Sequence, residues 1–462
     1  MSQTPFSSLK LQSALLENLT SLGYQAMTPI QAQSLPAILA GKDIIAQAKT
    51  GSGKTAAFSL GVLERLTVKR FRIQSLVLCP TRELADQVAK EIRRLARAIH
   101  NIKVLTLCGG MPFGPQAGSL EHGAHIIVGT PGRIQDHLSR GTLNLEAVNM
   151  LVLDEADRML DMGFQETLDA IIERIPLQRQ TLLFSATFPA QIDSIAQRIM
   201  VDPVRVQVEE GHDNSTIQQH LYRVTDDDQR ISALRLLLLH YRPESTVVFC
   251  NTRLETQALA DELNGHGFSA LALHGDMEQR DRDQTLVQFA NKSISILVAT
   301  DVAARGLDID GLDAVINFHI ARDAQVHTHR IGRTGRSGNR GIACTLYSEK
   351  ERYKVDRLTQ HLEQPIEPQP LPPISLLKES ARPAPMTTLQ IDGGKRQKLR
   401  AGDILGALTG QHGISGKQVG KIQLFDHRAY VAVSRSAAKI ALKKLAEGKL
   451  KGRSFRVRQI GR

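Results

Sequence analysis

The sequence predicts an α/β protein with two tandem parallel-sheet domains, followed by a small α+β domain. Three observations support this prediction. Strand and helix patterns alternate through two long stretches, a glycine-rich phosphate-binding sequence lies near the start of the first, and a short basic segment with the order βαββαβ follows a proline-rich one. We expect domains at residues 1–210, 211–364 and 387–462, with a linker at 365–386.

Length and composition support several domains. The 462 residues exceed what one core usually supports, and 42% of them are hydrophobic. No apolar run is long enough to cross a membrane, and residues 1–20 lack the charged start and hydrophobic block that are typical of a signal peptide. We therefore expect a cytoplasmic protein without a membrane partner. The wide spacing of the cysteines favours four reduced core thiols over disulfides or a zinc site: Cys79, Cys108, Cys250 and Cys344.

The positive charge is concentrated at the C-terminal end. Residues 387–462 hold 17 Lys and Arg against 4 Asp and Glu, whereas the rest of the chain holds 41 against 43. A basic segment of this kind is typical of nucleic-acid binding, although a solvated charged surface is the alternative.

The phosphate-binding sequence lies between a predicted strand and a predicted helix. Gly51 and Gly53 allow a tight turn whose N–H groups face a phosphate, Lys54 can reach the outer phosphates, and Thr55 offers a hydroxyl to Mg²⁺. A glycine-rich turn without a ligand is the alternative. The whole loop is Ala48, Lys49, Thr50, Gly51, Ser52, Gly53, Lys54 and Thr55.

Further strands of the first domain are predicted by short apolar runs. One of them, Met150 to Leu153, ends in Asp154 and Glu155. Carboxylates at this end of a parallel strand lie where such sheets bind ligands. Asp154 can hold Mg²⁺ through water and Glu155 can orient and deprotonate an attacking water, although acidic turns without function are common. Gln31 has a donor and an acceptor that could select adenine.

The second stretch repeats the pattern without a phosphate loop. Its predicted strands are Thr246–Cys250, Ala270–Leu273, Ile294–Ala299, Ala314–Phe318 and Ile342–Leu346. A short basic segment contains Arg330, Arg333 and Arg336. Phosphoryl transfer needs a cation near the transferring group, so these arginines could complete a nucleotide site on the first domain, or they could simply face solvent.

Taken together, these motifs resemble those of the DEAD-box RNA helicases, over about residues 6–345. The segment Asp154 to Asp157 spells the family name, and Ala48 is the family's usual residue at that position. The motifs that match are Pro80–Leu84, Gly109–Gly110, Thr130–Arg133, Ser185–Thr187, Val248–Thr252, His274–Asp276, Ala299–Asp308 and His329–Arg336.

The resemblance implies roles for individual residues and two RecA-like domains. ATP and Mg²⁺ are the implied cofactors, with Thr55 and Asp154 at the metal, and RNA is the implied partner of a monomer. Catalysis would fall on Lys54, Asp154, Glu155, Arg333 and Arg336. Besides the phosphate loop, ATP would contact Phe6, Tyr24, Thr28, Gln31 and Asp308, and Ser185 and Thr187 would couple the ATP and RNA sites. The RNA backbone would contact Thr81, Arg82, Gly110, Thr130, Gly132, Arg133, Gly275 and Thr300.

The C-terminal segment is expected to form an RNA-recognition (RRM-like) module. Seven of the 18 prolines lie in residues 365–385, which is typical of a semi-rigid linker. The module lacks the usual aromatic residues for base stacking and offers Tyr430, so basic residues such as Lys395 and Arg396 could do more of the binding. The arrangement resembles a bacterial branch of the family whose C-terminal domain docks on 23S ribosomal RNA during large-subunit assembly.

Two functions remain open. The chain could be an RNA-stimulated ATPase and non-processive helicase that remodels ribosomal RNA, or an RNA clamp that uses ATP only to lock on. Because Lys54, Glu155 and Arg333 are all present, the sequence favours the helicase.

Overall fold

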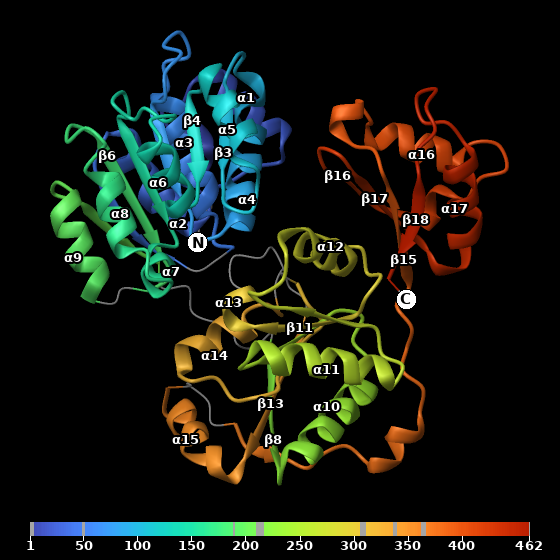
Figure 1. Cartoon of the computed structure of the whole chain (residues 1–462). Helices are drawn as coiled ribbons and strands as arrows, with labels where there is room; N and C mark the ends of the chain where they lie inside the picture. The colour runs from blue at the N-terminus through green and yellow to red at the C-terminus, as the bar shows by residue number, and fades with distance from the viewer. Residues whose placement is uncertain are drawn as a thin grey trace. The chain divides into compact units, whose positions relative to one another are not determined.

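The computed structural model describes residues 4–48, 51–187, 190–208, 217–304, 311–335, 340–361 and 366–461. The chain divides into two compact units, one holding residues 1–211 with 306–308 and the other holding the remainder. Figure 1 follows the chain through the elements of both. No helix in these ranges combines the length and the apolar character needed to span a membrane.

Unit 1 is built on a seven-stranded sheet in which all pairings are parallel, as predicted. The strand order is β3-β4-β2-β5-β6-β1-β7. Strands β2, β4, β5 and β6 are buried along their whole length, as expected where helices cover both faces. The strands are β1 (Ile44–Gln47), β2 (Ser75–Leu78), β3 (Val104–Leu107), β4 (Ile126–Gly129), β5 (Met150–Asp154), β6 (Gln180–Ser185) and β7 (Val204–Gln207).

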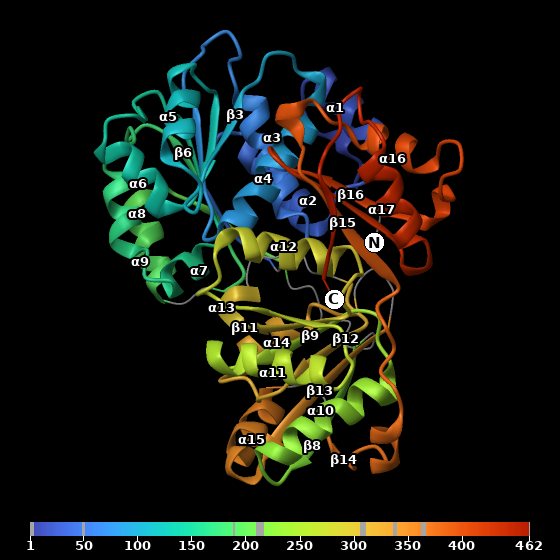
Figure 2. The same cartoon turned by 45° about the vertical axis from the view of Figure 1, so that its right-hand side comes forward.

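The helices of unit 1 form two layers, which lie on opposite sides of the sheet in Figure 2. One apolar core lies under α1 to α4 and the other under α6 to α9. The helices are α1 (Ser13–Ser21), α2 (Pro29–Leu39), α3 (Lys54–Arg65), α4 (Arg82–Leu95), α5 (Phe113–Glu121), α6 (Pro131–Ser139), α7 (Ala156–Asp161), α8 (Gln165–Ile172) and α9 (Ala190–Ile199).

Unit 2 contains a second parallel sheet with the order β10-β11-β9-β12-β13-β8-β14. Its strands are β8 (Ile217–Val224), β9 (Thr246–Cys250), β10 (Ala270–Leu273), β11 (Ile296–Thr300), β12 (Ala314–Asn317), β13 (Gly341–Ser348) and β14 (Pro368–Gln369). Its helices are α10 (Asp227–Tyr241), α11 (Arg253–Gly265), α12 (Gln279–Ala290), α13 (Asp301–Ala304), α14 (Ala324–Ile331) and α15 (Arg352–His361).

The proline-rich segment packs against the second sheet along part of its length. Its two-residue strand β14 pairs with β8 at the sheet edge, and a 3₁₀ helix at Ile374–Lys378 packs against α10. Arg382 donates to Glu244 at 3.1 Å. A proline-rich sequence cannot continue a sheet far, because each proline removes a donor, so the pairing stops after Gln369.

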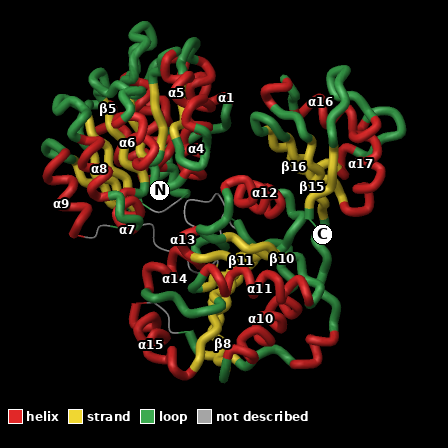
Figure 3. The backbone as a smooth tube through the Cα atoms, in the orientation of Figure 1, coloured by secondary structure: helices red, strands yellow, loops and turns green. Residues whose placement is uncertain are grey.

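The C-terminal domain has the predicted βαββαβ order and a four-stranded antiparallel sheet, β16-β17-β15-β18. Figure 3 shows its yellow strands with red helices on one side. The helices cover the face that carries Leu389 and Val431. The elements are β15 (Met386–Ile391), α16 (Ala401–Thr409), β16 (Val419–Leu424), β17 (Ala429–Ser434), α17 (Ala438–Glu447) and β18 (Val457–Ile460).

All four cysteines are buried and free, which confirms that prediction. Burial raises the pKa of each thiol, because the thiolate is poorly solvated in an apolar interior. The cysteines are therefore core residues.

Candidate nucleotide and RNA sites

The predicted motifs of unit 1 follow the carboxyl ends of six neighbouring strands. The phosphate loop follows β1, the Ser185–Thr187 segment ends β6, and Asp154 ends β5. Thr81, Gly110 and Thr130 follow β2, β3 and β4. Ligands bind parallel sheets at this edge, so the sheet order places the candidate ATP residues on one half and the candidate RNA residues on the other.

Gly53 joins the phosphate loop to the predicted adenine-reading segment. It has φ +97° and precedes α3, and a Cβ built on it would lie 2.6 Å from the Gln31 amide nitrogen and 2.8 Å from the Thr28 hydroxyl. Gln31 Nε2 donates to the Gly53 carbonyl at 3.1 Å, and its Oε1 accepts from the Thr28 N–H at 2.9 Å. Only glycine fits this close approach, so the loop and the start of α2 (Pro29–Leu39) are built against each other.

Two ionisable side chains beside this loop are buried with atoms that lack a hydrogen bond. Lys54 is 5% exposed and Asp154 2% exposed. Within the described ranges, Lys54 Nζ, Asp154 Oδ1 and Thr28 Oγ1 make no hydrogen bond. Burial raises the pKa of Asp154 to about 7, although the nearby Lys54 charge opposes this rise. Buried polar atoms without a hydrogen bond are costly. A triphosphate beside Lys54 and a divalent cation beside Asp154 would satisfy these atoms, so the residues fit Mg²⁺-bound ATP.

Glu155 has an unusual backbone. It is a non-glycine residue with φ +53°, immediately before α7 (Ala156–Asp161), and it is 4% exposed. Arg158 Nη1 donates to Glu155 Oε2 at 2.5 Å. Left-handed backbone at a carboxylate next to a candidate metal ligand is the kind of strain that gathers at functional sites.

Asp157 connects this turn to the Ser185–Thr187 segment. Asp157 Oδ2 accepts from the Thr187 N–H at 3.0 Å and from its hydroxyl at 2.7 Å, while Ser185 Oγ donates to the Thr187 carbonyl at 2.7 Å. The two segments therefore cannot move independently. This linkage supports the predicted coupling role of Ser185 and Thr187, which stays a prediction.

Phe6 and Tyr24 meet edge to face, with ring centroids 5.9 Å apart. The Tyr24 hydroxyl donates to Glu91 at 2.7 Å, and Arg94 lies 5.3 Å from the ring centroid. Burial and the Glu91 carboxylate raise the pKa of Tyr24 to about 12, so the phenol stays neutral. Phe6 is buried and Tyr24 is partly buried, so the two rings pack against each other inside unit 1.

Two predicted RNA contacts begin helices. Thr81 precedes α4 (Arg82–Leu95), where its hydroxyl accepts from the Leu84 N–H at 3.3 Å, and Thr130 precedes α6 (Pro131–Ser139). Helix N-termini present unpaired N–H groups that suit phosphate. Arg133, in the first turn of α6, donates to the Met111 carbonyl at 2.9 Å and so ties α6 to the loop that contains Gly110.

A Cβ built on Gly132 would meet no other atom within 4 Å, so the space beside this glycine is open to a ligand. Arg82 lies 3.8 Å from Asp86 on the first turns of α4. In unit 2, Gly275 is exposed after β10, and Thr300 ends β11 with its hydroxyl accepting from the Ala303 N–H at 3.3 Å.

The sequence suggested that Arg330 either completes a nucleotide site or faces solvent, but its side chain is buried in hydrogen bonds within unit 2. Its guanidinium donates to both Asp301 oxygens at 2.7 and 2.8 Å and to the His319 carbonyl at 2.8 Å, and it is 2% exposed. These hydrogen-bond partners all belong to unit 2. Arg333 is also buried. Lys49, Thr50, Asp308 and Arg336 lie outside the described residues.

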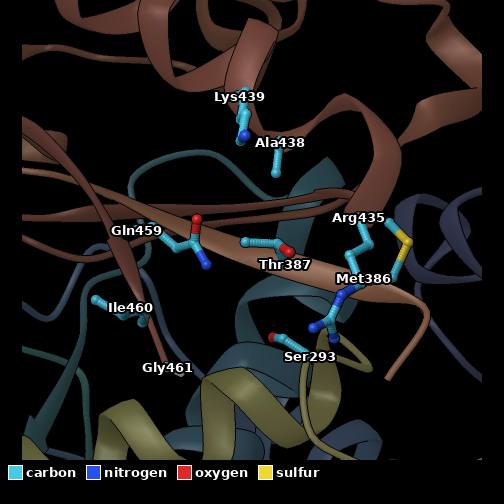
Figure 4. A pocket seen from close by; sticks show the side chains of 9 residues that line it. All are labelled: Ser293, Met386, Thr387, Arg435, Ala438, Lys439, Gln459, Ile460 and Gly461. Carbon is cyan, nitrogen blue, oxygen red and sulfur yellow. The ribbon is translucent and has the colours of Figure 1, made fainter. Parts of the chain in front are cut away.

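In the C-terminal domain, Lys395 and Arg396 are exposed, whereas Tyr430 is only 3% exposed. Tyr430 packs with Val287 of α12 and Ile460 of β18, and Asn291 donates to the Thr388 hydroxyl at 3.1 Å. Figure 4 shows the neighbouring hollow, with Ser293 below side chains of the β15–β18 sheet. The sheet face that would stack bases is therefore covered at Tyr430, and a role for this ring in RNA binding stays a prediction.

The sequence interpretation missed two partners that matter for the sites, Arg158 and Asp301. Arg158 stands three residues after Glu155, a spacing at which helical side chains meet, and this was an available signal. Asp301 is 29 residues from Arg330, and no local pattern connects them.

Three family models match the chain. "DEAD/DEAH box helicase" covers residues 28–195, "Helicase conserved C-terminal domain" covers 229–338, and "DbpA RNA binding domain" covers 388–459. Together they account for both parallel-sheet domains and the C-terminal domain.

Similar proteins agree with these matches. ATP-dependent RNA helicase DbpA of Escherichia coli is 54% identical over 98% of this chain and 99% of its own. DEAD-box ATP-dependent RNA helicase CshA of Geobacillus kaustophilus is 44% identical over 75% of this chain and 74% of its own. Among solved structures, S. cerevisiae Dbp5 bound to RNA and ADP BeF3 matches 80% of this chain and 96% of its own, with 28% identity and a TM-score of 0.72.

Proposed function

Because this chain belongs to the DEAD-box ATP-dependent RNA helicases, we propose that it remodels 23S ribosomal RNA in the cytoplasm during assembly of the large ribosomal subunit. Its C-terminal domain would select the RNA, and the two parallel-sheet domains would open short duplexes without processive movement. The observation that carries this proposal is the C-terminal match to the DbpA RNA-binding domain, together with 54% identity to DbpA over nearly the whole chain.

The roles proposed for ATP hydrolysis fall on residues of unit 1 and on Arg333 of unit 2. Lys54 binds the outer phosphates, and Thr55 and Asp154 hold Mg²⁺, partly through water. The metal, when bound, neutralises charge on the phosphates. Glu155 orients and deprotonates the attacking water, and Arg333 supplies the cation that stabilises the transferring group.

The contacts proposed between the parallel-sheet domains and RNA are made with the RNA backbone. Thr81, Thr130 and Gly132 offer hydroxyl and N–H groups at helix N-termini, which suit phosphates and 2′-hydroxyls but carry no sequence information. Selection of one RNA must then come from another surface. The basic C-terminal domain, held near the core by a linker that packs on the second sheet, is the part of the chain that can provide it.

The experiment removes charge from that domain in the full chain. K395A with R396A should raise the concentration of 23S ribosomal RNA that gives half-maximal ATPase stimulation at least about tenfold, which corresponds to about 1.4 kcal/mol of lost RNA affinity. Lys69 and Arg70 are likewise adjacent and exposed, on unit 1. K69A with R70A is therefore the charge-matched control and should leave stimulation unchanged.

A second RNA of equal length separates selection from general attraction. Phosphate contacts alone weaken steeply with salt and ignore sequence. We expect stimulation by 23S ribosomal RNA to survive moderate salt and stimulation by the unrelated RNA to be small throughout. Equal stimulation by both RNAs across the salt series would contradict the proposed target and leave an RNA helicase without this preference.

A further inference from the structure

We propose that Arg158 is a positioning residue for ATP hydrolysis, which fixes the Glu155 carboxylate in the direction needed to activate water. The inference rests on the proposed role of Glu155 as the group that acts on water. It assigns a function to the ion pair between Arg158 Nη1 and Glu155 Oε2, at 2.5 Å.

The first argument is burial. The Arg158 and Glu155 side chains are 7% and 5% exposed, so water competes little for their hydrogen bonds. A charge-assisted hydrogen bond in such a place is short and directional, unlike a surface pair. A buried carboxylate that must point at one water benefits from a partner of this kind, because small misplacements of a catalytic group are costly.

The second argument is the backbone. Glu155 stands at φ +53° and ψ +50°, directly before α7. This conformation turns its side chain back toward the first turn of the helix, where Arg158 lies three residues on. The Arg158 N–H also donates to the Asp157 side chain at 3.0 Å. The acidic turn and the arginine therefore form one rigid unit.

The third argument is the division of charge around the two adjacent carboxylates. The positive charges of Lys54 and Arg158 both oppose the rise in the pKa of Asp154, and Lys54 has the larger effect of the two. The proposed roles send Lys54 to the phosphates and Asp154 to Mg²⁺. Arg158 is the cation that hydrogen-bonds to the Glu155 carboxylate.

A purely structural role for Arg158 is the competing explanation, and the two predict different kinetics. Arg158→Met in the full chain should lower kcat of RNA-stimulated ATP hydrolysis about 100-fold. The Kd for a fluorescent ATP analogue and the Kd for RNA should both stay within about twofold, because the phosphate loop and RNA residues are untouched. Arg158→Lys, which keeps a donor and the charge, should recover part of the lost kcat.

Arg179→Met is the matched control. Arg179 is a partly buried arginine of unit 1 that donates to the Pro176 and Ile199 carbonyls, at the other end of β6. This variant should lower the melting temperature. Its kcat, measured well below that melting temperature, should be unchanged. If Arg158→Met lowers the melting temperature like Arg179→Met and keeps normal kcat, Arg158 is only structural and the proposal is wrong.

Glu155→Gln separates a failure of the inference from a failure of the role on which it rests. Loss of hydrolysis with retained nucleotide binding supports the role of Glu155. If Glu155→Gln still hydrolyses ATP normally, that role is wrong. If Glu155→Gln is inactive while Arg158→Met is active, only the inference about Arg158 fails. Should Arg158→Met not fold, Arg158→Lys and Arg158→Gln decide: equal kcat to the parent chain in both would overturn the proposal.

Discussion

At the scale of single residues, Arg330 shows how burial changes the meaning of a basic motif. Three arginines at this spacing are equivalent in the sequence, but Arg330 forms a bidentate pair with Asp301 and lies 5.1 Å from the Phe249 ring centroid. Removing one partner of a buried pair usually costs about 3 kcal/mol or more. Arg330 therefore links α13 and α14 to the sheet. The cation proposed for catalysis would then have to come from Arg333 or Arg336.

His327, in the same helix, predicts a pH dependence of stability. It is 2% exposed, its Nε2 donates to Gln219 Oε1 at 3.1 Å, and its Nδ1 has no partner among the described residues. Burial, with the Arg330 charge as a second cause, lowers the pKa of His327 from 6.5 to about 4. Because the unfolded chain binds this proton first, the free energy of unfolding should fall as pH falls from 6.5 to about 4, by up to about 3 kcal/mol.

Urea unfolding of the full chain at several pH values measures this effect. His327→Gln removes the titration but keeps a side chain of similar polarity, so its stability should change less with pH over that window. His122, which is exposed, provides the control His122→Gln, which should follow the parent chain. Identical slopes for the parent chain and His327→Gln would show that His327 does not titrate as its burial requires.

At the scale of elements, the start of α3 and the start of α2 depend on one glycine. Gly53→Ala would force a Cβ into the Gln31 amide and the Thr28 hydroxyl and would also strain a left-handed residue, which costs about 1–2 kcal/mol. The displaced loop should weaken ATP binding at least about tenfold. Titration of a fluorescent ATP analogue measures the Kd.

Gly41→Ala is the control for this prediction. Gly41 has φ +79°, but its Cβ would meet only the end of Arg65, at 3.7 Å. The substitution imposes similar backbone strain away from the nucleotide residues, so it should lower the melting temperature and keep the Kd. A Kd for Gly53→Ala equal to that of Gly41→Ala would mean that the close approach to Gln31 is unimportant for binding.

Many of the strands and helices could be predicted, because runs of apolar residues and glycines at helix ends are local features of the sequence. Predicted and observed strands coincide at Thr246–Cys250 and Ala270–Leu273. The strand expected at Ile294–Ala299 is shifted by one or two residues, to Ile296–Thr300. The pairing of β14 with β8 could not be predicted, since a two-residue strand joins positions about 150 apart through backbone groups that no side-chain pattern marks.

At the scale of the whole chain, motif order predicted the candidate site residues, but the covering of Tyr430 could not be read from the sequence. A single aromatic on β17 looks like an exposed stacking residue, and only the contact with α12 shows otherwise. Gln288 and Asn291 of this region each keep a buried side-chain oxygen without a hydrogen bond among the described residues. Such oxygens cost about 1–3 kcal/mol each, so this contact is less stable than its burial alone suggests.

The two parallel-sheet domains should divide the work of hydrolysis, and Arg333 tests this division. The phosphate loop that binds ATP lies in unit 1, whereas Arg333 belongs to unit 2. Arg333→Ala should therefore keep the Kd for ATP within about twofold and slow RNA-stimulated hydrolysis by about 10³, the usual cost of removing the cation that stabilises the transferring phosphoryl group. Arg352→Ala, at an exposed arginine of the same unit, should change neither quantity. Single-turnover hydrolysis with saturating ATP and RNA measures the step directly. If ATP affinity collapsed while turnover per bound ATP stayed normal, Arg333 would be a binding residue, and the cation would have to be assigned to Arg336.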